Sequence, residues 1–191
     1  MPPATVATVF AVDDALVARC RRGEPAAQEQ LYRKLAPRLL GVARRYSRSD
    51  PDAEDALQRA MLNILTRLAQ WQQQGPFEAW ARRITVNTAL DGWRRADPRA
   101  ISWDDAPDVA NPDPTSLDQL SADDLLALLD TLPPGYRTVR NLYAIEGYSH
   151  PEIAALLGIA EGTSKSQLAR ARALLARKLT LTAAAVAAPL R

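Results

Sequence analysis

The sequence predicts an all-α protein with two small helical domains. Apolar residues recur at steps of three and four over most of the chain, which is the spacing of amphipathic helices that pack face to face. No segment shows the alternation of a β-strand. A length of 191 residues suits one or two small domains, and an acidic segment divides the two helical stretches.

The first stretch predicts a short helix followed by three longer ones. The short helix is expected from Asp13 to Arg22. Pro51 and the aspartates after it are typical of a helix start, and "QQQGPF" separates that helix from the next. The three apolar stripes are Leu31, Leu35, Leu39, Val42 and Tyr46, then Leu57, Ala60, Met61, Ile64, Leu65 and Leu68, then Phe77, Trp80, Ala81 and Ile84.

The segment between the two stretches is acidic and contains Pro98, Pro107, Pro112 and Pro114, so we expect an exposed linker. Residues 97–130 hold Arg99 against nine aspartates. Residues 1–96 hold 15 basic and 10 acidic residues, and residues 131–191 hold 8 and 3. This asymmetry suggests two modules that meet a polyanion, joined by a segment that does not. The linker charge would repel nucleic acid or shield a basic surface until something displaces it.

The second stretch predicts four short helices. Leu125, Leu126, Leu128, Leu129 and Leu132 precede a stop at Pro133-Pro134, and Tyr136, Val139, Leu142 and Tyr143 precede a stop at Gly147. Ser149 and Glu152 form a capping box, with Pro151 in the first turn. Gly158 ends this helix where a positive φ is needed, and the last helix begins near Gly162-Thr163.

The motif "SHPEIAALLGIAEGTSKSQLARARALL" has the spacing of a helix-turn-helix. Its second helix carries five cations between Gly162 and Lys178 and no acidic residue. With Leu168 and Leu175 facing inward, its first half offers side chains that contact base edges and phosphates in a major groove. The alternative to DNA binding is a solvent-exposed amphipathic helix with an ordinary basic face. The outward set is Thr163, Lys165, Ser166, Gln167, Arg170 and Arg172.

Other classes of protein find less support in the sequence. One cysteine, Cys20, excludes an internal disulfide and fits a buried thiol in a reducing, cytosolic compartment. The N-terminus lacks the basic region of a signal peptide, and the apolar tail is too short to span a bilayer. The acids Asp50, Asp52, Glu54 and Asp55 fit a helix N-terminus better than a metal site. We therefore expect no enzyme, no metal and no cofactor.

Both stretches resemble one known family. "YAIEGYSHPEIAALLGIAEGTSKSQLARARALLARKL" and "LDTLPPGYRTVRNLY" resemble the promoter-recognition domain of bacterial RNA polymerase sigma factors. "DAEDALQRAMLNILTRLAQW" and "FEAWARRITVNTALDGWRR" resemble the N-terminal domain of that family. The layout is that of the extracytoplasmic-function (ECF) group of the sigma-70 family. It implies region 2 over 13–96, a linker over 97–116, region 4 over 117–179 and a tail over 180–191.

The resemblance implies a factor that binds core RNA polymerase at the beta-prime clamp and the beta flap, directs it to promoter DNA and supports opening of the duplex. It implies a monomer within the holoenzyme, no cofactor, and an anti-sigma protein as a further partner. A conventional helix-turn-helix regulator that binds duplex DNA without core polymerase is the alternative.

The resemblance also implies three sets of contact residues. Phe77 and Trp80 lie on an apolar stripe, so burial competes with base stacking there, and Arg94 and Arg95 would either contact the backbone or complement the helix dipole. The −35 set is Thr163, Ser164, Lys165, Ser166, Gln167, Ala169, Arg170 and Arg172; the −10 set is Phe77, Trp80, Arg83, Asn87, Asp91, Arg94 and Arg95; the core-binding set is Asp55, Gln58, Arg59, Leu62 and Asn63.

Three positions stand out against the family pattern. Arg59 stands where an acidic residue is usual, which changes the local polarity of the clamp contact. Ser164 stands where valine is usual, so it either weakens the apolar anchor of the recognition helix or lets a hydroxyl reach a phosphate. His150 is the single histidine and is expected to be exposed in the first turn of its helix.

Overall fold

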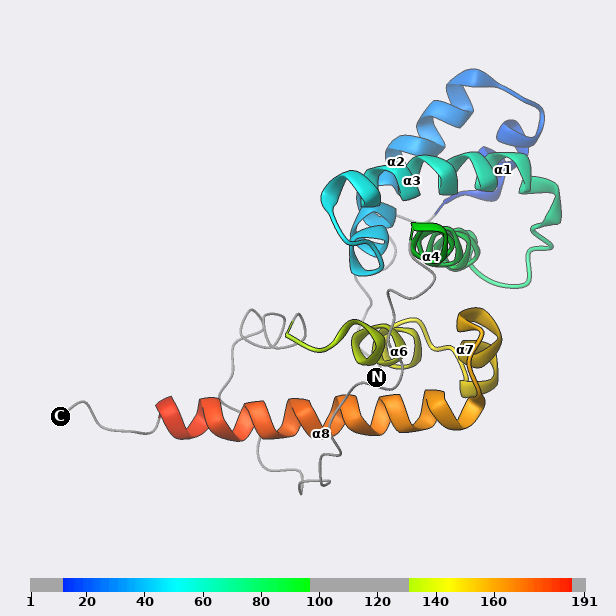
Figure 1. Cartoon of the computed structure of the whole chain (residues 1–191). Helices are drawn as coiled ribbons and strands as arrows, with labels where there is room; N and C mark the ends of the chain where they lie inside the picture. Colours follow the sequence, from blue (N-terminus) through cyan, green and yellow to red (C-terminus); the bar gives the residue numbers. More distant parts are fainter. Residues whose placement is uncertain (1–11, 97–130, 187–191) are drawn as a thin grey trace, which may run out of the picture. The chain divides into compact units, whose positions relative to one another are not determined.

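The computed structural model describes residues 12–96 and 131–186, which form two helical units (Figure 1). Every regular element in these ranges is a helix, as the predicted class requires. The predicted linker over 97–116, the leucines from 125 to 129 and the last residues of the tail lie outside them. The elements are α1 (Asp14–Arg21), α2 (Pro25–Arg45), α3 (Asp50–Thr66), the 3₁₀ helix η2 (Leu68–Gln70) and α4 (Phe77–Ala96), then α6 (Pro134–Ala144), α7 (His150–Leu157) and α8 (Glu161–Val186).

Helix starts in the first unit follow the capping signals of the sequence. The Asp13 carboxylate accepts from the N–H of Ala15 at 3.0 Å and begins α1. The Ser49 hydroxyl accepts from the N–H of Asp52 at 3.3 Å and begins α3, with Pro51 in the first turn. Side-chain caps replace backbone partners that the first turn lacks. The predicted starts near Asp13 and Pro51 are therefore confirmed.

The predicted apolar stripes form the core of the first unit. All five residues of the first predicted stripe are buried, and in the second stripe only Leu65 is partly exposed. Phe77 and Ala81 of α4 are buried, while Trp80 and Ile84 pack at the edge of the core. α3 packs against both α2 and α4, and α1 packs on α2. Helix α4, which carries the predicted −10 contacts, is thus held by burial of one face.

Arg21 at the end of α1 fastens the connection between α3 and α4. Its Nε and Nη2 donate to the carbonyl of Leu68 at 3.1 and 2.9 Å, and Nη2 also donates to the carbonyl of Trp71 at 2.7 Å. The guanidinium carbon lies 5.8 Å from the centroid of the Trp71 ring. The Leu68 carbonyl also accepts from the N–H of Trp71 at 3.3 Å, so Arg21 adds charged donors to a backbone hydrogen bond of this short 3₁₀ helix.

In the second unit, α6 and α7 both pack against α8. Leu132, Tyr136 and Ala171 are buried together, and Leu174 and Leu175 pack on them. Val139, Leu142 and Ile153 are also fully buried. Tyr143, which the sequence grouped with this stripe, is 38% exposed instead because it lies at the edge of the α6 face.

No helix in residues 12–96 or 131–186 combines the length and the apolar character needed to cross a bilayer.

Candidate functional site

The turn between α7 and α8 has the geometry that the sequence predicts. The Ser149 N–H donates to the Glu152 carboxylate at 2.9 Å, which completes the capping box at the start of α7. Gly158 ends α7 with φ +69°, in the left-handed region that favours glycine. α8 begins at Glu161, one residue before the predicted start. The result is a helix-turn-helix whose second helix is α8 (Figure 1).

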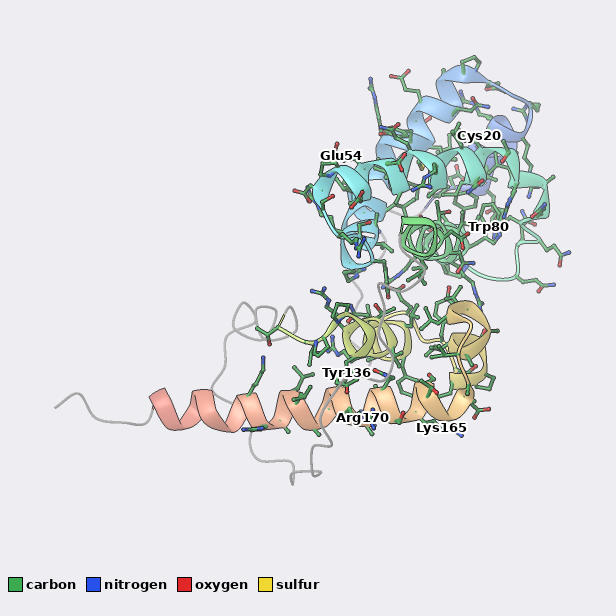
Figure 2. The ribbon with its side chains drawn as sticks, in the orientation of Figure 1. Cys20, Glu54, Trp80, Tyr136, Lys165 and Arg170 are labelled. Atoms are coloured by element: carbon green, nitrogen blue, oxygen red, sulfur yellow. The ribbon has the colours of Figure 1, made fainter. Side chains whose placement is uncertain are left out.

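The first half of α8 presents cations and small polar groups to solvent. Lys165, Ser166, Ala169 and Arg172 are exposed, and Thr163 and Arg170 are half-buried. Figure 2 shows Lys165 and Arg170 on this one helix. An α-helix fits the major groove of B-DNA, where such groups contact base edges and phosphates. Most of the predicted −35 set therefore lies where duplex DNA can reach it.

Two members of the predicted −35 set do not lie there. Ser164 and Gln167 are both 0% exposed. They precede Leu168 and Ala171 by four residues on the helix, so they share the stripe that packs on α6 and α7. The expectation of DNA contacts from these two side chains is wrong, and so is the idea that the Ser164 hydroxyl reaches a phosphate.

His150 is not the exposed residue that the sequence led us to expect. It is half-buried, and its Nδ1 lies 2.9 Å from the hydroxyl oxygen of Ser164. Its ring stacks on that of Tyr143, with centroids 4.8 Å apart and planes 23° from parallel. The only sequence signal was indirect: a polar residue on the buried stripe of α8 needs a partner.

Charge pairing arranges the exposed face of α8. Lys165 Nζ lies 2.7 Å from a carboxylate oxygen of Glu161, one helical turn earlier. The hydrogen bond and the charge of Lys165 lower the pKa of Glu161 below its ordinary value of 4.5. The Arg172 guanidinium carbon lies 5.9 Å from the centroid of the Tyr143 ring, within the range of a cation–π contact.

Phe77 and Trp80 of α4 are core residues more than stacking surfaces. Phe77 is 2% exposed and meets Trp71 edge to face at 5.1 Å between centroids. Trp80 lies 5.4 Å from Phe77 and is half-buried against the same core. The expectation of a base contact is therefore wrong for Phe77, and for Trp80 only the exposed part of the ring is accessible.

The other −10 candidates lie further along α4. Arg83 is exposed, and Asn87 and Asp91 are half-buried. The Asn87 Oδ1 is buried and has no hydrogen-bond partner among the described residues, so it is an unsatisfied acceptor. The side chains of Arg94 and Arg95 lie outside the described set.

Three of the predicted core-binding residues form an exposed face of α3. Asp55, Gln58 and Leu62 are exposed, and Leu62 is 63% exposed despite being apolar. Asn63 was expected to be exposed as well but is half-buried, because its Nδ2 donates to Thr88 Oγ1 of α4 at 3.3 Å. Asn63 therefore ties α3 to α4.

Arg59, the unusual residue of this helix, bridges α3 and α4. Its Nη2 lies 2.8 Å from an Asp55 carboxylate oxygen, one turn earlier. On the other side, a Cβ added at Gly92 of α4 would lie 3.0 Å from the same Nη2. Sequence reasoning missed this close approach, in which a side chain at position 92 would displace the end of the Arg59 side chain by a few tenths of an ångström.

The acidic residues at the start of α3 have local partners. Asp50 lies 2.9 Å from Arg44, Asp52 accepts from the Ser49 hydroxyl at 2.8 Å, and Asp55 pairs with Arg59. Glu54 projects from the same first turns (Figure 2). Across residues 12–96 and 131–186, no three His, Cys, Asp or Glu side chains lie close enough together to hold a metal ion.

Comparison with known proteins matches both units to one family. The model for Sigma-70 region 2 matches residues 31–99, and the model for Sigma-70, region 4 matches residues 122–175. The chain is 38% identical over 168 residues to the ECF RNA polymerase sigma factor SigM of Mycobacterium tuberculosis, covering 87% of this chain and 84% of SigM. It is 37% identical over 150 residues to SigE of Mycolicibacterium smegmatis, covering 75% of this chain and 58% of SigE.

Solved structures agree with this assignment. The sigma factor RpoE of Bartonella quintana, solved in complex with the anti-sigma factor NepR, is 25% identical with a TM-score of 0.50, covering 80% of this chain and 96% of RpoE. The family models match both helical units in the order that the sequence predicts. The chain therefore belongs to the ECF group of the sigma-70 family of RNA polymerase sigma factors.

Proposed function

We propose that this chain binds core RNA polymerase, directs it to specific promoters and supports opening of the promoter duplex. The observation that carries the proposal is the presence, in one chain, of an α3–α4 unit matching region 2 and a helix-turn-helix unit matching region 4. A duplex-binding regulator needs only the second. No observation favours that alternative.

Recognition of the −35 element is assigned to the exposed half of α8. Lys165, Ser166 and Ala169 face solvent, and Arg170 is half-buried beside them. Each well-placed base contact supplies about 1–3 kcal/mol of discrimination. Arg172 is assigned to the phosphate backbone, which would make binding sensitive to salt.

Recognition of the −10 element is assigned to the exposed side of α4. Arg83 offers a cation for the backbone, and Asn87 offers an amide whose buried oxygen has no partner among the described residues. A base taken out of the duplex must be held by hydrogen bonds to its edge. An amide donates and accepts, which suits it to such a contact.

Binding of core polymerase is assigned to the exposed face of α3. Leu62 supplies an apolar anchor, and Asp55 and Gln58 supply polar groups beside it. An exposed apolar side chain with a polar surround is typical of protein interfaces. Because Arg59 already pairs with Asp55, we expect the clamp to meet a partly neutralised carboxylate.

Two further parts of the proposal rest on the relatives. The solved complex of the Bartonella RpoE with NepR supports an anti-sigma protein as a partner of this chain. A protein that works on core polymerase acts in the cytoplasm, without catalysing a reaction itself. The polymerase performs the chemistry, and the sigma factor supplies promoter selection.

Dependence on core polymerase is the decisive test. Purified protein is mixed with bacterial core polymerase and DNA fragments from upstream of its own gene, and run-off transcripts are separated by size. We expect a discrete transcript that requires both proteins, whose start site locates both promoter elements. Tight duplex binding by the chain alone, without transcript or association with core, would support the conventional regulator.

The contact of α8 with the −35 element is tested by Arg170→Ala. We expect weaker transcription from the promoter found above and unchanged association with core. Arg177→Ala is the matched control, because Arg177 is exposed on the same helix two turns further on. Equal losses for the two variants would remove the assignment of Arg170 to the −35 element.

A further inference from the structure

A polar pair lies at the contact between α7 and α8. The Ser164 side chain is 0% exposed, and its hydroxyl oxygen lies 2.9 Å from Nδ1 of His150. A buried hydroxyl without a hydrogen bond costs free energy, so this pair decides how well the two helices fit. The contact joins the first residue of α7 to the first turn of α8, across the turn at Gly158.

The imidazole is itself fixed in place from a third helix. The Tyr143 ring of α6 stacks on it at 4.8 Å between centroids, and the Arg172 guanidinium lies 5.9 Å from that same tyrosine ring. Stacking and cation–π contacts favour one orientation of each ring. One chain of contacts therefore runs from Ser164 through His150 and Tyr143 to Arg172, which is exposed.

We propose that His150 is a positioning residue for −35 recognition. Its hydrogen bond to Ser164 fixes the rotation of α8 about its own axis, and its stacking on Tyr143 orients the surface that supports Arg172. This inference rests on the proposed function, because it assigns the exposed half of α8 to promoter DNA. His150 itself does not touch DNA.

The geometry of base recognition makes this rotation matter. Lys165 and Ser166 directly follow Ser164 along α8, so any turn of the helix about Ser164 moves both of them. Hydrogen bonds to base edges weaken steeply as distance and angle depart from their optimum. Sites held by supporting contacts keep their geometry, and sites without that support loosen. Loss of the His150–Ser164 pair should therefore weaken −35 contacts without exposing a new surface.

A double-mutant cycle on the full chain tests the proposal. The variants are Ser164→Val, His150→Phe and both together, each assembled with core polymerase on the promoter fragment identified by run-off transcription. Phenylalanine keeps a ring to stack on Tyr143 but cannot form the hydrogen bond. Each single change leaves one buried or half-buried polar group without its partner, whereas the double change replaces both by apolar groups.

We expect each single variant to bind the promoter about 5- to 10-fold more weakly, a change of about 1–1.4 kcal/mol in binding free energy, because the base-contacting groups of α8 are displaced. The double variant should return to within about 2- to 3-fold of the unmodified holoenzyme. A double variant whose loss equals the product of the two single losses would overturn the positioning role. On a promoter fragment with a scrambled −35 element, the variants should not differ.

Two measurements on the free protein separate this proposal from misfolding and from failure of the proposed function. The first is thermal unfolding. If Ser164→Val does not fold, Ser164→Ala takes its place in the cycle. The second is NMR of the imidazole nitrogens, in which the Nδ1 shift should change in Ser164→Val and in no variant remote from α7.

An unchanged Nδ1 shift would show that the contact is absent in solution and would overturn the proposal. A chain that gives no core-dependent transcript would overturn the proposed function and, with it, any role in −35 recognition. In that case an NMR shift that responds to Ser164→Val would still establish the contact as a feature of the fold.

Discussion

Replacing Phe77 by alanine tests whether this residue supports the core or stacks on a promoter base. The ring is 2% exposed and lies between Trp71 and Trp80, at 5.1 and 5.4 Å between centroids. Truncation of a buried phenylalanine costs about 3–5 kcal/mol, because apolar burial is lost and a cavity remains. Small domains have about 5–15 kcal/mol of stability in total, so the first unit should lose a large part of its own.

Tryptophan fluorescence during urea unfolding is a selective assay for this loss. Trp71 and Trp80 lie beside Phe77 in the first unit, and a Trp103→Phe background removes the tryptophan that lies beyond residues 12–96. We expect the midpoint for Phe77→Ala to fall sharply in the absence of any DNA. Promoter opening should fall only as far as the folded fraction does.

Arg83→Ala is the matched control, because Arg83 lies on the same helix and is exposed. A surface change of this kind alters stability by about 0.5 kcal/mol or less, so its effect should be confined to promoter opening. The reasoning would be refuted if Phe77→Ala kept its stability within about 1 kcal/mol and still failed to open the promoter. Phe77 would then be a stacking residue.

Three further predictions concern single groups. Gly158→Ala should destabilise the second unit by about 1–2 kcal/mol, because φ is +69° there. Gly162→Ala is the control and should be neutral or stabilising, because position 162 is helical and nothing lies within 4 Å of the new Cβ. Urea unfolding followed by circular dichroism compares the two variants. The pKa of the Glu161 carboxyl, followed by NMR, should lie below 4.5 and should rise in Lys165→Ala. The stability that this ion pair adds is therefore present above pH 4.5 and is lost as the pH falls through the lowered pKa. Burial raises the pKa of the Cys20 thiol, so it should react with a thiol reagent only slowly in the folded protein and rapidly in urea; fast reaction of the native chain would show that α1 is not docked.

Helices could be predicted from this sequence because their signals are local. The capping box at Ser149, the glycine at 158 and the apolar stripe of α2 each lie within one or two turns of the structure that they specify. Spacing and capping depend on neighbours in sequence, so no knowledge of tertiary packing was needed.

Side-chain exposure near the edge of a stripe could not be predicted in the same way. Gln167 was placed in the outward set, and for Ser164 a place in the apolar anchor and a contact with phosphate were both left open, yet their positions before Ala171 and Leu168 put both on the buried face. Asn63 was expected to be exposed from its place in the core-binding motif, and its side chain is bonded to Thr88 instead. Such outcomes depend on which helix packs alongside, and this is set by contacts between residues far apart in sequence.

The contact of His150 with Ser164 could not be predicted from the sequence either. The two residues are fourteen positions apart and lie on different helices, so no spacing or capping signal within one helix pairs them. The positive φ of Gly158 and the turn after it bring the two helix starts together. A pairwise contact of this kind becomes visible only when the crossing of α7 and α8 is known.

Helix α1 changes where a folded fragment of this protein has to begin. The region 2 match starts at residue 31, but Leu16, Val17 and Cys20 of α1 are part of the core that α2 helps to form. Arg21 of the same helix donates hydrogen bonds to the carbonyls of Leu68 and Trp71. A fragment cut at residue 31 would expose that core and leave the loop before α4 unsupported. The smallest unit suitable for expression, labelling or crystallisation should start at or before Val12.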